Sequence, residues 1–483
     1  MTRQKPDSST HWSHAIAAAL LAGLLLLNIY RAVTQSFVHD EAQTYHLYLR
    51  SSWRTMFAVY DANHHFLSTL LVRLSTSLFG FSELAMRLPT LVAGAWYFVI
   101  VFRLARLALD RGWRFLLAIV LAAANPLVLD FLVAARGYGL AMALLAFGIY
   151  RIVGYLSVGS RGRSALCEAG ISLALAVSAN VTLLVPVMVA GALLLAVLWK
   201  QQDSRWPYFL TTLCAVLLLF YAISPIHQAT QANFYYGAHS LIESFEDLAA
   251  LSLAHNPGPF HWNRLLGWMG WWRHFAIFAC AAACLGAMAV AVRTWNWLLL
   301  FASFMVAGSW AILFVAHHVT GLLYPLDRTG LYFLPLIGLL FPCLSAAIRE
   351  HPVPSRLCAV IGAVIACQYL LQPNTSRFYI WTFDADTKSV VDFLDAGHPV
   401  SARLGTSWPL DPALNYYRDR RKITWFAPLT RTGPDGQFDY YLLMEADQDR
   451  VVRNQLKVLY RGPISGTVVA TRLFSVPDGP RAH

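Results

Sequence analysis

Apolar residues recur in long runs along the first three quarters of the chain, with short polar segments between them. Most runs are near the length, about 20 residues, at which a helix spans a bilayer. The runs are Ala15–Ile29, Leu88–Leu109, Phe115–Val133, Leu140–Val153, Ile171–Trp199, Phe209–Ile223, Phe275–Val292, Trp297–Ala316, Gly330–Ile348 and Leu357–Leu371. The run at 171–199 is too long for one span, and we expect Asn180 and Pro186 to divide it. The pattern predicts a mainly α fold, a polytopic membrane helix bundle of about 11 spans.

The pattern changes at about residue 374, where hydropathy falls and charged and turn residues become frequent. In this tail, Asp386–Leu394 and Gln448–Leu459 resemble helices, and Phe438–Met444 and Thr467–Val476 resemble strands. We therefore expect a transmembrane domain at 1–373 and a small soluble α/β domain at 374–483, long enough for a core of its own.

The basic residues between the runs indicate orientation, because lysine and arginine are enriched in cytoplasmic loops. The basic segments are 103–114, 151–163, 200–205, Arg293 and 349–356. We place the N-terminus in the cytoplasm and take the first run as a retained anchor. The segment 66–81 is then an amphipathic helix at the outer interface, not a full span. The segments 34–87, 136–138, 225–272 and 317–328 fall outside, together with the tail.

Composition narrows the class of protein. The chain has 483 residues, of which 57% are hydrophobic and 13% charged, and its mean hydropathy is +0.49. These values exclude an ordinary soluble enzyme. The net charge of +11 lies mostly in loops between runs and does not indicate nucleic-acid binding. The seven cysteines are scattered, none lies after residue 367, and their spacing suggests neither a disulfide framework nor a metal site.

Two adjacent carboxylates, Asp40 and Glu41, follow the first apolar run by about ten residues. Acidic side chains at the mouth of a membrane bundle are costly unless they are used. A carboxylate here suits a general base that takes a proton from an attacking hydroxyl. It also suits a ligand for a hard divalent cation, although nothing requires a metal. The alternatives are a helix cap and a surface acid pair.

Basic side chains stand at further outer positions. His64 and His65 precede the interfacial segment and suit a phosphate or a sugar hydroxyl, and the alternative is a capping or interfacial turn. Arg136, near Tyr138, ends one apolar run, and Arg328 stands at the outer end of another. Such a guanidinium either snorkels to the headgroups or clamps a lipid-linked phosphate. Both interpretations stay open at this point.

The outer loop at 225–272 is rich in aromatic, histidine and amide side chains, which suit sugar recognition and equally an aromatic belt at the interface. These residues are Phe234, Tyr235, Tyr236, His239, His255, Asn256, His261, Trp262 and Trp268.

The order of these features resembles a known superfamily. Asp-Glu after the first span precedes Asn63-His-His-Phe66, then a segment ending Leu78-Phe-Gly-Phe-Ser-Glu-Leu-Ala-Met-Arg-Leu-Pro89, then Ala135-Arg-Gly-Tyr138. This order is similar to that of the protein O-mannosyltransferase and aminoarabinose transferase superfamily of membrane glycosyltransferases, which have the type C fold. The similarity covers residues 15–150. Beyond them it rests on the architecture and on Asp327-Arg328.

The resemblance implies a polyprenyl-phosphate monosaccharide as donor and an inverting transfer. It implies that Asp40 is the catalytic carboxylate, with Glu41 beside it, and that Arg136 and Arg328 hold the phosphate. The superfamily often has Pro-Pro or His-Pro where this chain has His64-His65-Phe66, so the role of the histidines stays open.

The sequence therefore predicts a glycosyltransferase of the cell (inner) membrane that acts on an envelope glycan, lipid or protein acceptor. Membrane lipids are its expected surroundings, and nucleic acid is not an expected partner. Two alternatives stay open. One is a transporter or lipid flippase, although no internal repeat is visible. The other is a non-catalytic envelope assembly protein whose tail binds partners.

Overall fold

The computed structural model describes residues 11–109, 111–157, 162–253, 271–397 and 401–472. The chain divides into two compact units. The membrane unit comprises Met1–Tyr30, Met56–Leu78 and Met86–Asn374. The tail unit comprises Arg31–Thr55, Phe79–Ala85 and Thr375–His483. Each unit has its own core.

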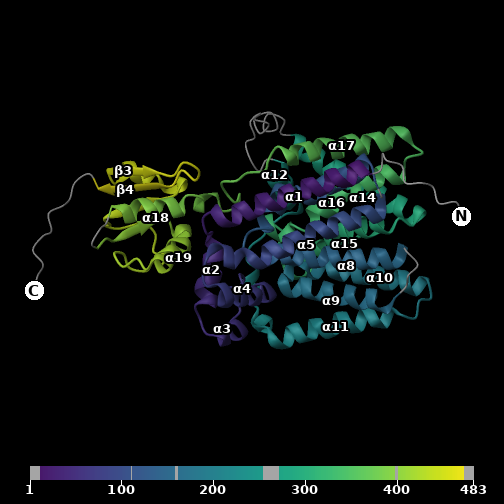
Figure 1. The fold of residues 1–483 in the computed structure, drawn as a ribbon, viewed down its shortest axis with the longest axis horizontal. Helices are drawn as coiled ribbons and strands as arrows, with labels where there is room; N and C mark the ends of the chain where they lie inside the picture. The colour runs from purple at the N-terminus through teal and green to yellow at the C-terminus, as the bar shows by residue number, and fades with distance from the viewer. Residues whose placement is uncertain (1–10, 110, 158–161, 254–270, 398–400, 473–483) are drawn as a thin grey trace, which may run out of the picture. The chain divides into compact units, whose positions relative to one another are not determined.

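The membrane unit is a bundle of helices whose axes run broadly side by side (Figure 1). Its helices are α1 (His11–Thr34), α4 (Phe66–Phe79), α5 (Glu83–Leu109), α6 (Trp113–Ala123), α7 (Pro126–Phe131), α8 (Gly137–Ser157), α9 (Arg163–Ala179), α10 (Leu184–Lys200), α11 (Trp206–Ile223), α12 (Leu241–Leu253), α14 (Trp271–Thr294), α15 (Trp297–Thr320), α16 (Phe333–Ala347) and α17 (Pro352–Leu370). A short helix, α3 (Trp53–Ala58), precedes α4.

The predicted apolar runs are largely helical. Among the described residues, eight helices are long and apolar enough to cross a membrane: α1, α5, α8, α10, α11, α14, α15 and α17. The predicted runs at 115–133, 171–199 and 330–348 also hold α6, α9 and α16, which are shorter than 18 residues. The prediction of a polytopic, mainly α bundle with a small sheet in the tail is confirmed.

Two asparagines separate successive helices of the bundle. The predicted division at Asn180 is confirmed, because α9 ends at Ala179 and Asn180 adopts an extended φ of −157°. Its side-chain oxygen accepts the Thr182 N–H at 3.0 Å and so caps the next turn. Pro186 does not break the chain as expected. It stands in the first turn of α10, where its missing N–H would have no helical partner.

Asn125 makes a second interruption, which the sequence analysis did not predict. Its side-chain oxygen accepts the N–H groups of Leu127 and Val128, and Pro126 takes the first position of α7. The asparagine cap and the proline at the first helical position start a new helix, α7, after the end of α6.

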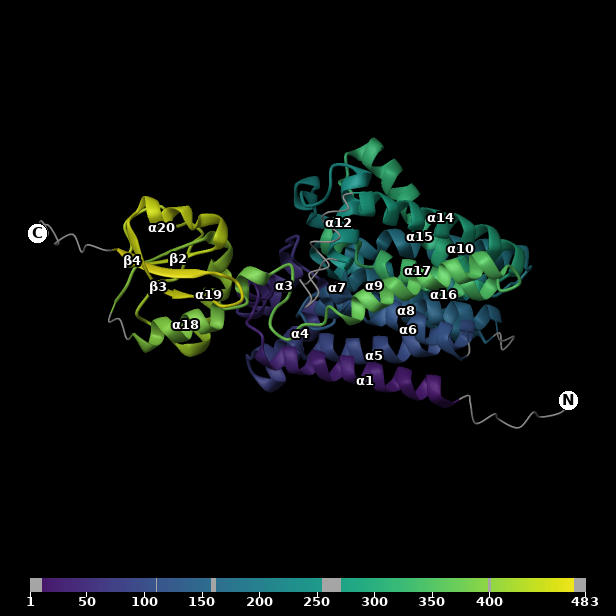
Figure 2. The same ribbon diagram turned by 90° about the horizontal axis from the view of Figure 1, so that it is seen from above.

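The tail unit is a four-stranded sheet with helices. Its elements are α2 (His39–Thr44), the π-helical turn η2 (Tyr45–Leu49), α18 (Thr387–Ala396), β1 (Leu404–Thr406), α19 (Asp411–Arg421), β2 (Tyr440–Leu443), α20 (Asp449–Arg453), β3 (Leu456–Arg461) and β4 (Val468–Arg472). The strand order is β1-β2-β4-β3; β1 and β2 are parallel, and the other pairs are antiparallel. In Figure 2 the strands lie between α20 and α18.

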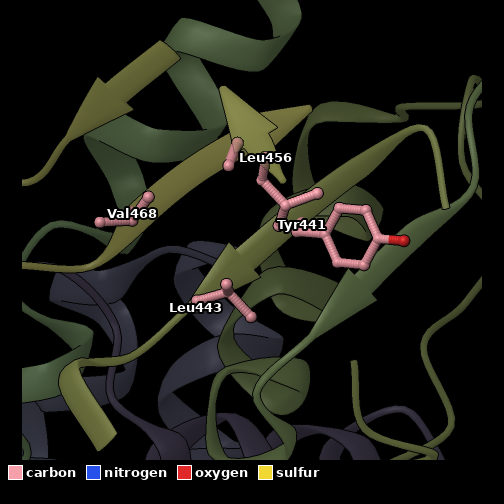
Figure 3. Packing of buried hydrophobic residues seen from close by; sticks show 5 residues of the cluster. Tyr441, Leu443, Leu456 and Val468 are labelled. Atoms are coloured by element: carbon pink, nitrogen blue, oxygen red, sulfur yellow. The ribbon is translucent and has the colours of Figure 1, made fainter. Parts of the chain in front are cut away.

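The core of the tail unit sits on the sheet. Leu443 and Tyr441 of β2 are fully buried with Val468 and Ala470 of β4, and Leu456 of β3 joins them (Figure 3). Phe438 and Val451 pack against this cluster. These alternating apolar residues are what the strand pattern predicted.

The predicted helix at 448–459 is wrong. Only α20 is helical, and Gln455 then adopts a left-handed φ of 51° that ends it. Leu456–Arg461 is a strand that pairs with β4. The sequence pattern missed this because the five-residue helix and the strand follow each other with a single turn between them. The strand predicted at 467–476 is β4, and its last residues lie outside the described part of the chain.

The division into units differs from the predicted boundary at residue 373. The segment Arg31–Thr55 was assigned to the membrane domain, but it belongs with the tail. The Arg31 guanidinium donates to the Arg377 carbonyl at 3.0 Å and lies 5.0 Å from the Phe378 ring centroid. Helix α2 packs on α19, where the rings of Phe37 and Tyr416 stack at 4.1 Å. The predicted first outer loop is thus shared between two cores.

Candidate active site

The predicted site residues fall into two groups, one in each unit. His64, His65, Arg136, Tyr138 and Arg328 belong to the membrane unit. Asp40 and Glu41 belong to the tail unit. Each group is described by itself.

The centre of the first group is a buried contact between His65 and Arg136. An Arg136 guanidinium nitrogen lies 3.0 Å from the Nε2 atom of His65. Arginine has no acceptor, so the guanidinium donates and a neutral imidazole accepts. The ring of Tyr138 meets the His65 ring edge-on, with centroids 4.9 Å apart. The structure therefore brings His65 together with Arg136, which is 71 positions away, and with Tyr138 of the same turn.

The turn that carries Arg136 requires a glycine. A Cβ at Gly137 would lie 2.1 Å from the Ala179 carbonyl and 2.6 Å from the His65 Cβ. Real side chains do not approach so closely, so the start of α8 touches His65 and the end of α9 only because Gly137 has no side chain. This close packing explains why a glycine stands between Arg136 and Tyr138.

A tight turn positions the two histidines. Asp61 accepts the backbone N–H groups of Asn63, through its side chain at 2.8 Å, and of His64, through its carbonyl at 2.8 Å. The His65 carbonyl then accepts from Thr69 in the first turn of α4 at 2.8 Å. These bonds fix the backbone of the turn, and the side chains of both histidines are buried.

Burial fixes the protonation state of these histidines. Loss of water lowers the pKa of His64 to about 4. The pKa of His65 is lowered well below its usual value by burial and then by the charges of Arg136 and Arg328 and by His64. Both rings are therefore neutral at physiological pH. The influence of Arg328 on His65 also places the second predicted arginine in this group.

Arg328 also takes part in a second set of contacts within the membrane unit. Its guanidinium lies 4.9 Å from the ring centroid of Tyr236 and 3.4 Å from the Asp327 carboxylate. The Tyr236 hydroxyl donates to the same carboxylate. The backbone N–H of Asp327 donates to Asp247 at 2.6 Å, and Asp327 has a left-handed φ of 43°. This strained turn orients Arg328.

Two of the loops that the sequence assigned to the outer face meet at this network. Ala238 and Tyr324 exchange both backbone hydrogen bonds at 2.9 Å. Gly237 permits the approach, since a Cβ there would lie 2.6 Å from the Tyr324 carbonyl. Five residues of the predicted aromatic and amide-rich loop lie outside the described residues: His255, Asn256, His261, Trp262 and Trp268.

A small cavity adjoins the histidines. It is lined by His64 and His65 and by residues at the ends of α9 and α11, including Asn180 and Ser224. Asn180 is buried, and within the described part of the chain its side-chain Nδ2 has no hydrogen-bond partner. A buried amide donor of this kind needs an acceptor from a ligand or a water molecule. The sequence analysis treated Asn180 only as a helix breaker.

The second group stands at the start of α2. Asp40 and Glu41 are both buried in the tail unit, which excludes a solvated surface pair. The Glu41 carboxylate accepts the Val38 N–H at 3.2 Å and so caps the helix, where negative charge is favourable. The bond from Val38 fits the capping alternative for Glu41. The catalytic roles of Asp40 and Glu41 stay predictions.

Asp384 lies beside this pair and was missed by the sequence analysis. Its carboxylate accepts the His39 N–H at 2.6 Å. Burial raises its pKa well above the usual value, and the charges of Asp40 and Glu41 raise it further, against the hydrogen bonds from His39 and Thr387. No signal in a single sequence links a residue at 384 to the turn at 39, because Asp384 lies near the start of an ordinary-looking helix. Among the described residues, no group of three or more histidine, cysteine or acidic side chains is arranged to hold a metal ion.

Comparisons with known proteins agree with the fold. Residues 63–226 match the family model of dolichyl-phosphate-mannose-protein mannosyltransferases. The matched segment includes His64, His65, Arg136 and Tyr138 and excludes the Asp40–Glu41 pair and Arg328. No curated protein sequence matches the chain.

Solved structures resemble the chain over most of its length. ArnT from Cupriavidus metallidurans in the apo state has a TM-score of 0.51 at 12% identity, covering 96% of this chain and 98% of that one. The structure of the same protein bound to undecaprenyl phosphate has a TM-score of 0.48 at 12% identity, covering 94% and 97%. The arabinosyltransferase EmbB from Mycobacterium smegmatis has a TM-score of 0.43 at 12% identity, covering 72% of this chain and 31% of that one. The match to the family model, the likeness to ArnT in the apo state and the eight candidate spans together show a polytopic membrane protein with the type C fold that membrane glycosyltransferases have.

Proposed function

We propose that this protein transfers a sugar from a polyprenyl-phosphate monosaccharide to an acceptor of the cell envelope, with inversion at the anomeric carbon. The acceptor is a glycan, a lipid or a protein on the outer face of the cell (inner) membrane. The N-terminus is cytoplasmic and the tail extracytoplasmic, as the basic loops suggest.

The observation that carries this proposal is the buried contact between Arg136 and His65. It lies inside the segment that matches the mannosyltransferase family model. The neutral imidazole accepts one of the five N–H groups that a guanidinium carries, and a neutral ring does not cancel the positive charge of the arginine. A guanidinium held in this way suits the phosphate of a lipid-linked sugar. Arg328 supplies a second cation to the same group, as its effect on the His65 pKa indicates.

The chemistry needs few further groups. The acceptor hydroxyl attacks the anomeric carbon and gives its proton to Asp40, which acts as general base. The bond between that carbon and the phosphate oxygen breaks, and the phosphate leaves with the electron pair. The arginines stabilise the charge that develops on the phosphate, so that no general acid is required. Positioning of donor and acceptor provides much of the remaining rate enhancement.

The residues around Asp40 fit this role better than that of a metal ligand. The Glu41 carboxylate is already engaged with the backbone of Val38. Asp384, the third carboxyl nearby, accepts a backbone N–H and a hydroxyl. With two of the three carboxyls engaged in this way, the site offers few oxygens for the six to eight that calcium prefers. We therefore derive no step through a metal.

The experiment is a transfer assay with purified protein in lipid nanodiscs. Radiolabelled polyprenyl-phosphate monosaccharides are offered singly, with a membrane extract as acceptor. Wild type is compared with Arg136→Gln and with Arg151→Gln, a control arginine in a partly exposed ion pair with Glu168. We expect label to reach a new product with one donor. Arg136→Gln should lower kcat/KM at least tenfold, about 1.4 kcal/mol, and the control should stay near wild type.

Two results would contradict the proposal. One is the absence of transfer from every donor by protein that is folded. The other is equal activity of wild type and Arg136→Gln. Movement of the labelled lipid across the bilayer without formation of product would favour a flippase instead.

A further inference from the structure

The turn that carries Asp40 is tied to the C-terminal segment by several hydrogen bonds. Ser36 and Phe37, which precede α2, and His39, its first residue, each make a hydrogen bond to a residue more than 300 positions away. The bonds are Ser36 Oγ to the Ala385 carbonyl at 2.8 Å, the Phe37 N–H to the Tyr417 hydroxyl at 2.9 Å, the His39 N–H to Asp384 Oδ2 at 2.6 Å, and His39 Nδ1 with the Pro409 carbonyl at 2.6 Å. All of them lie within the tail unit.

Helix α2 is too short to be stable without tertiary contacts. It has six residues and continues into a π-helical turn of five. Helices of this length are not stable in isolation, because the first turn fixes several dihedral angles for one hydrogen bond. The direction of α2, and with it the place of Asp40, is therefore set by what its first residues contact.

We propose that Asp384 is a positioning residue for the transfer reaction, which holds the first turn of α2 and thereby orients the carboxylate of Asp40. The inference rests on the proposed function, in which Asp40 is the base. It gives the C-terminal segment a role in catalysis: the segment is part of the framework of the active site.

The geometry around Asp384 supports this role. The side chain is fully buried, its Oδ2 accepts the His39 N–H, and its Oδ1 accepts the Thr387 hydroxyl at 3.3 Å. His39 is the first residue of α2, so its N–H has no partner within the helix. One carboxyl thus joins the start of α2 to the start of α18, directly before the proposed base.

The chemistry of the neighbourhood predicts which substitution preserves the role. Burial is the largest cause of the raised pKa of Asp384, and the charges of Asp40 and Glu41 raise this pKa further. Asparagine has nearly the same shape as aspartate and carries no charge, and its side-chain oxygen can also accept from His39. Alanine leaves the partly buried His39 N–H without this acceptor.

The experiment uses the full-length protein with three substitutions in the C-terminal segment. Asp384→Ala should lower kcat at least tenfold and change the KM for the donor less than threefold. Asp384→Asn should stay within about threefold of wild type. Asp386→Ala is the matched control, since the Asp386 carboxylate is also buried and accepts backbone N–H groups of Ile464 and Ser465, away from α2. It should retain kcat within threefold.

A second pair of variants tests the same bond from its other end. His39→Ala removes the ring and keeps the N–H, whereas His39→Pro removes both. Proline is well tolerated at the first position of a helix, and the preceding Val38 already has an extended backbone. We expect His39→Pro to have a kcat at least fivefold below that of His39→Ala. This comparison decides the question even if Asp384→Ala does not fold.

Hydrogen exchange separates this inference from the proposed function. Amides of residues 36–44 should exchange at least tenfold faster in Asp384→Ala than in wild type, and at the wild-type rate in Asp386→Ala. If wild type transfers no sugar, the proposed function fails, and exchange still tests the bond. Equal losses in Asp384→Ala and Asp386→Ala, or equal activities of His39→Ala and His39→Pro, would overturn the positioning role.

Discussion

At the scale of single residues, burial decides what the two histidines before α4 can do. An ionised imidazole would lose its hydration there and would stand near the positive charges of Arg136 and Arg328. His65 therefore accepts a hydrogen bond from Arg136 and does not contact a phosphate as a cation. This observation resolves part of what the sequence left open. Both histidines line the cavity beside Asn180, and the sequence could not show that either ring is neutral.

His64 gives a prediction about pH and stability. Its pKa in the folded protein is about 4, below the ordinary value near 6.5. Between these values the unfolded chain binds more protons than the folded one, so stability rises with pH. The contribution of neutral His64 to the free energy of unfolding is complete above about pH 6.5, and it falls by about 2 kcal/mol by pH 5.

The measurement is the apparent melting temperature at pH 5 and pH 8. His64→Gln should show a smaller decrease at pH 5 than wild type, because glutamine does not titrate. His227→Gln, at an exposed histidine, is the control and should behave as wild type. Identical pH dependence in wild type and His64→Gln would show that His64 is not buried in its neutral form.

At the scale of elements, local signals predicted some boundaries and missed others. Asn180 divided α9 from α10 as expected, because a short polar side chain can cap the next turn by itself. The strand β3 was not predicted, because its pairing with β4 is a tertiary contact and the sequence before it favours a helix. The carboxylates at 40 and 41 were found from their position after a span. The contact of α2 with α19 has no local signal, because their residues are separated by more than 300 positions.

The turn between α7 and α8 gives a prediction at this scale. Gly137→Ala would place a methyl group against the Ala179 carbonyl and His65. The backbone must shift, which should cost about 1–3 kcal/mol and weaken the contact between Arg136 and His65. Gly154→Ala on the same helix is the control, since the nearest atom to its Cβ, on Leu107, is 4.0 Å away.

The melting temperature and the KM for the donor measure these effects. Gly137→Ala should lower the melting temperature and raise the KM for the donor. Gly154→Ala should leave the KM unchanged and should not lower stability, because alanine favours a helix over glycine by about 1 kcal/mol. Wild-type behaviour of Gly137→Ala would mean that α8 and His65 are not in close contact.

At the scale of the whole molecule, the chain has two cores that share the segment 31–85. Residues 31–55 and 79–85 are part of the tail unit, and residues 56–78 between them are part of the membrane unit. Hydropathy predicted the membrane unit, and the composition of the tail predicted a separate soluble domain. Neither could assign the segment 31–85, because that assignment depends on long-range hydrogen bonds and ring contacts such as that of Phe37 with Tyr416.

The proposed orientation can be tested with single cysteines in a variant that lacks the seven native ones. Val452→Cys lies on the exposed side of α20, with 83% of the residue accessible. It should react with a membrane-impermeant thiol reagent in intact cells. Ser164→Cys, exposed at the start of α9 beside a basic loop, should react only after the cells are permeabilised. The reverse pattern would invert the orientation.

The most direct test of the central claim is the rate of sugar transfer by Asp40→Asn. The substitution removes the proposed base and keeps the size of the side chain, and expression and melting temperature establish that the variant is folded. With the donor that wild type accepts, we predict a kcat at least 100-fold below wild type, in the range typical for loss of a general base. Transfer by Asp40→Asn at near the wild-type rate would contradict the assignment of Asp40 as the base.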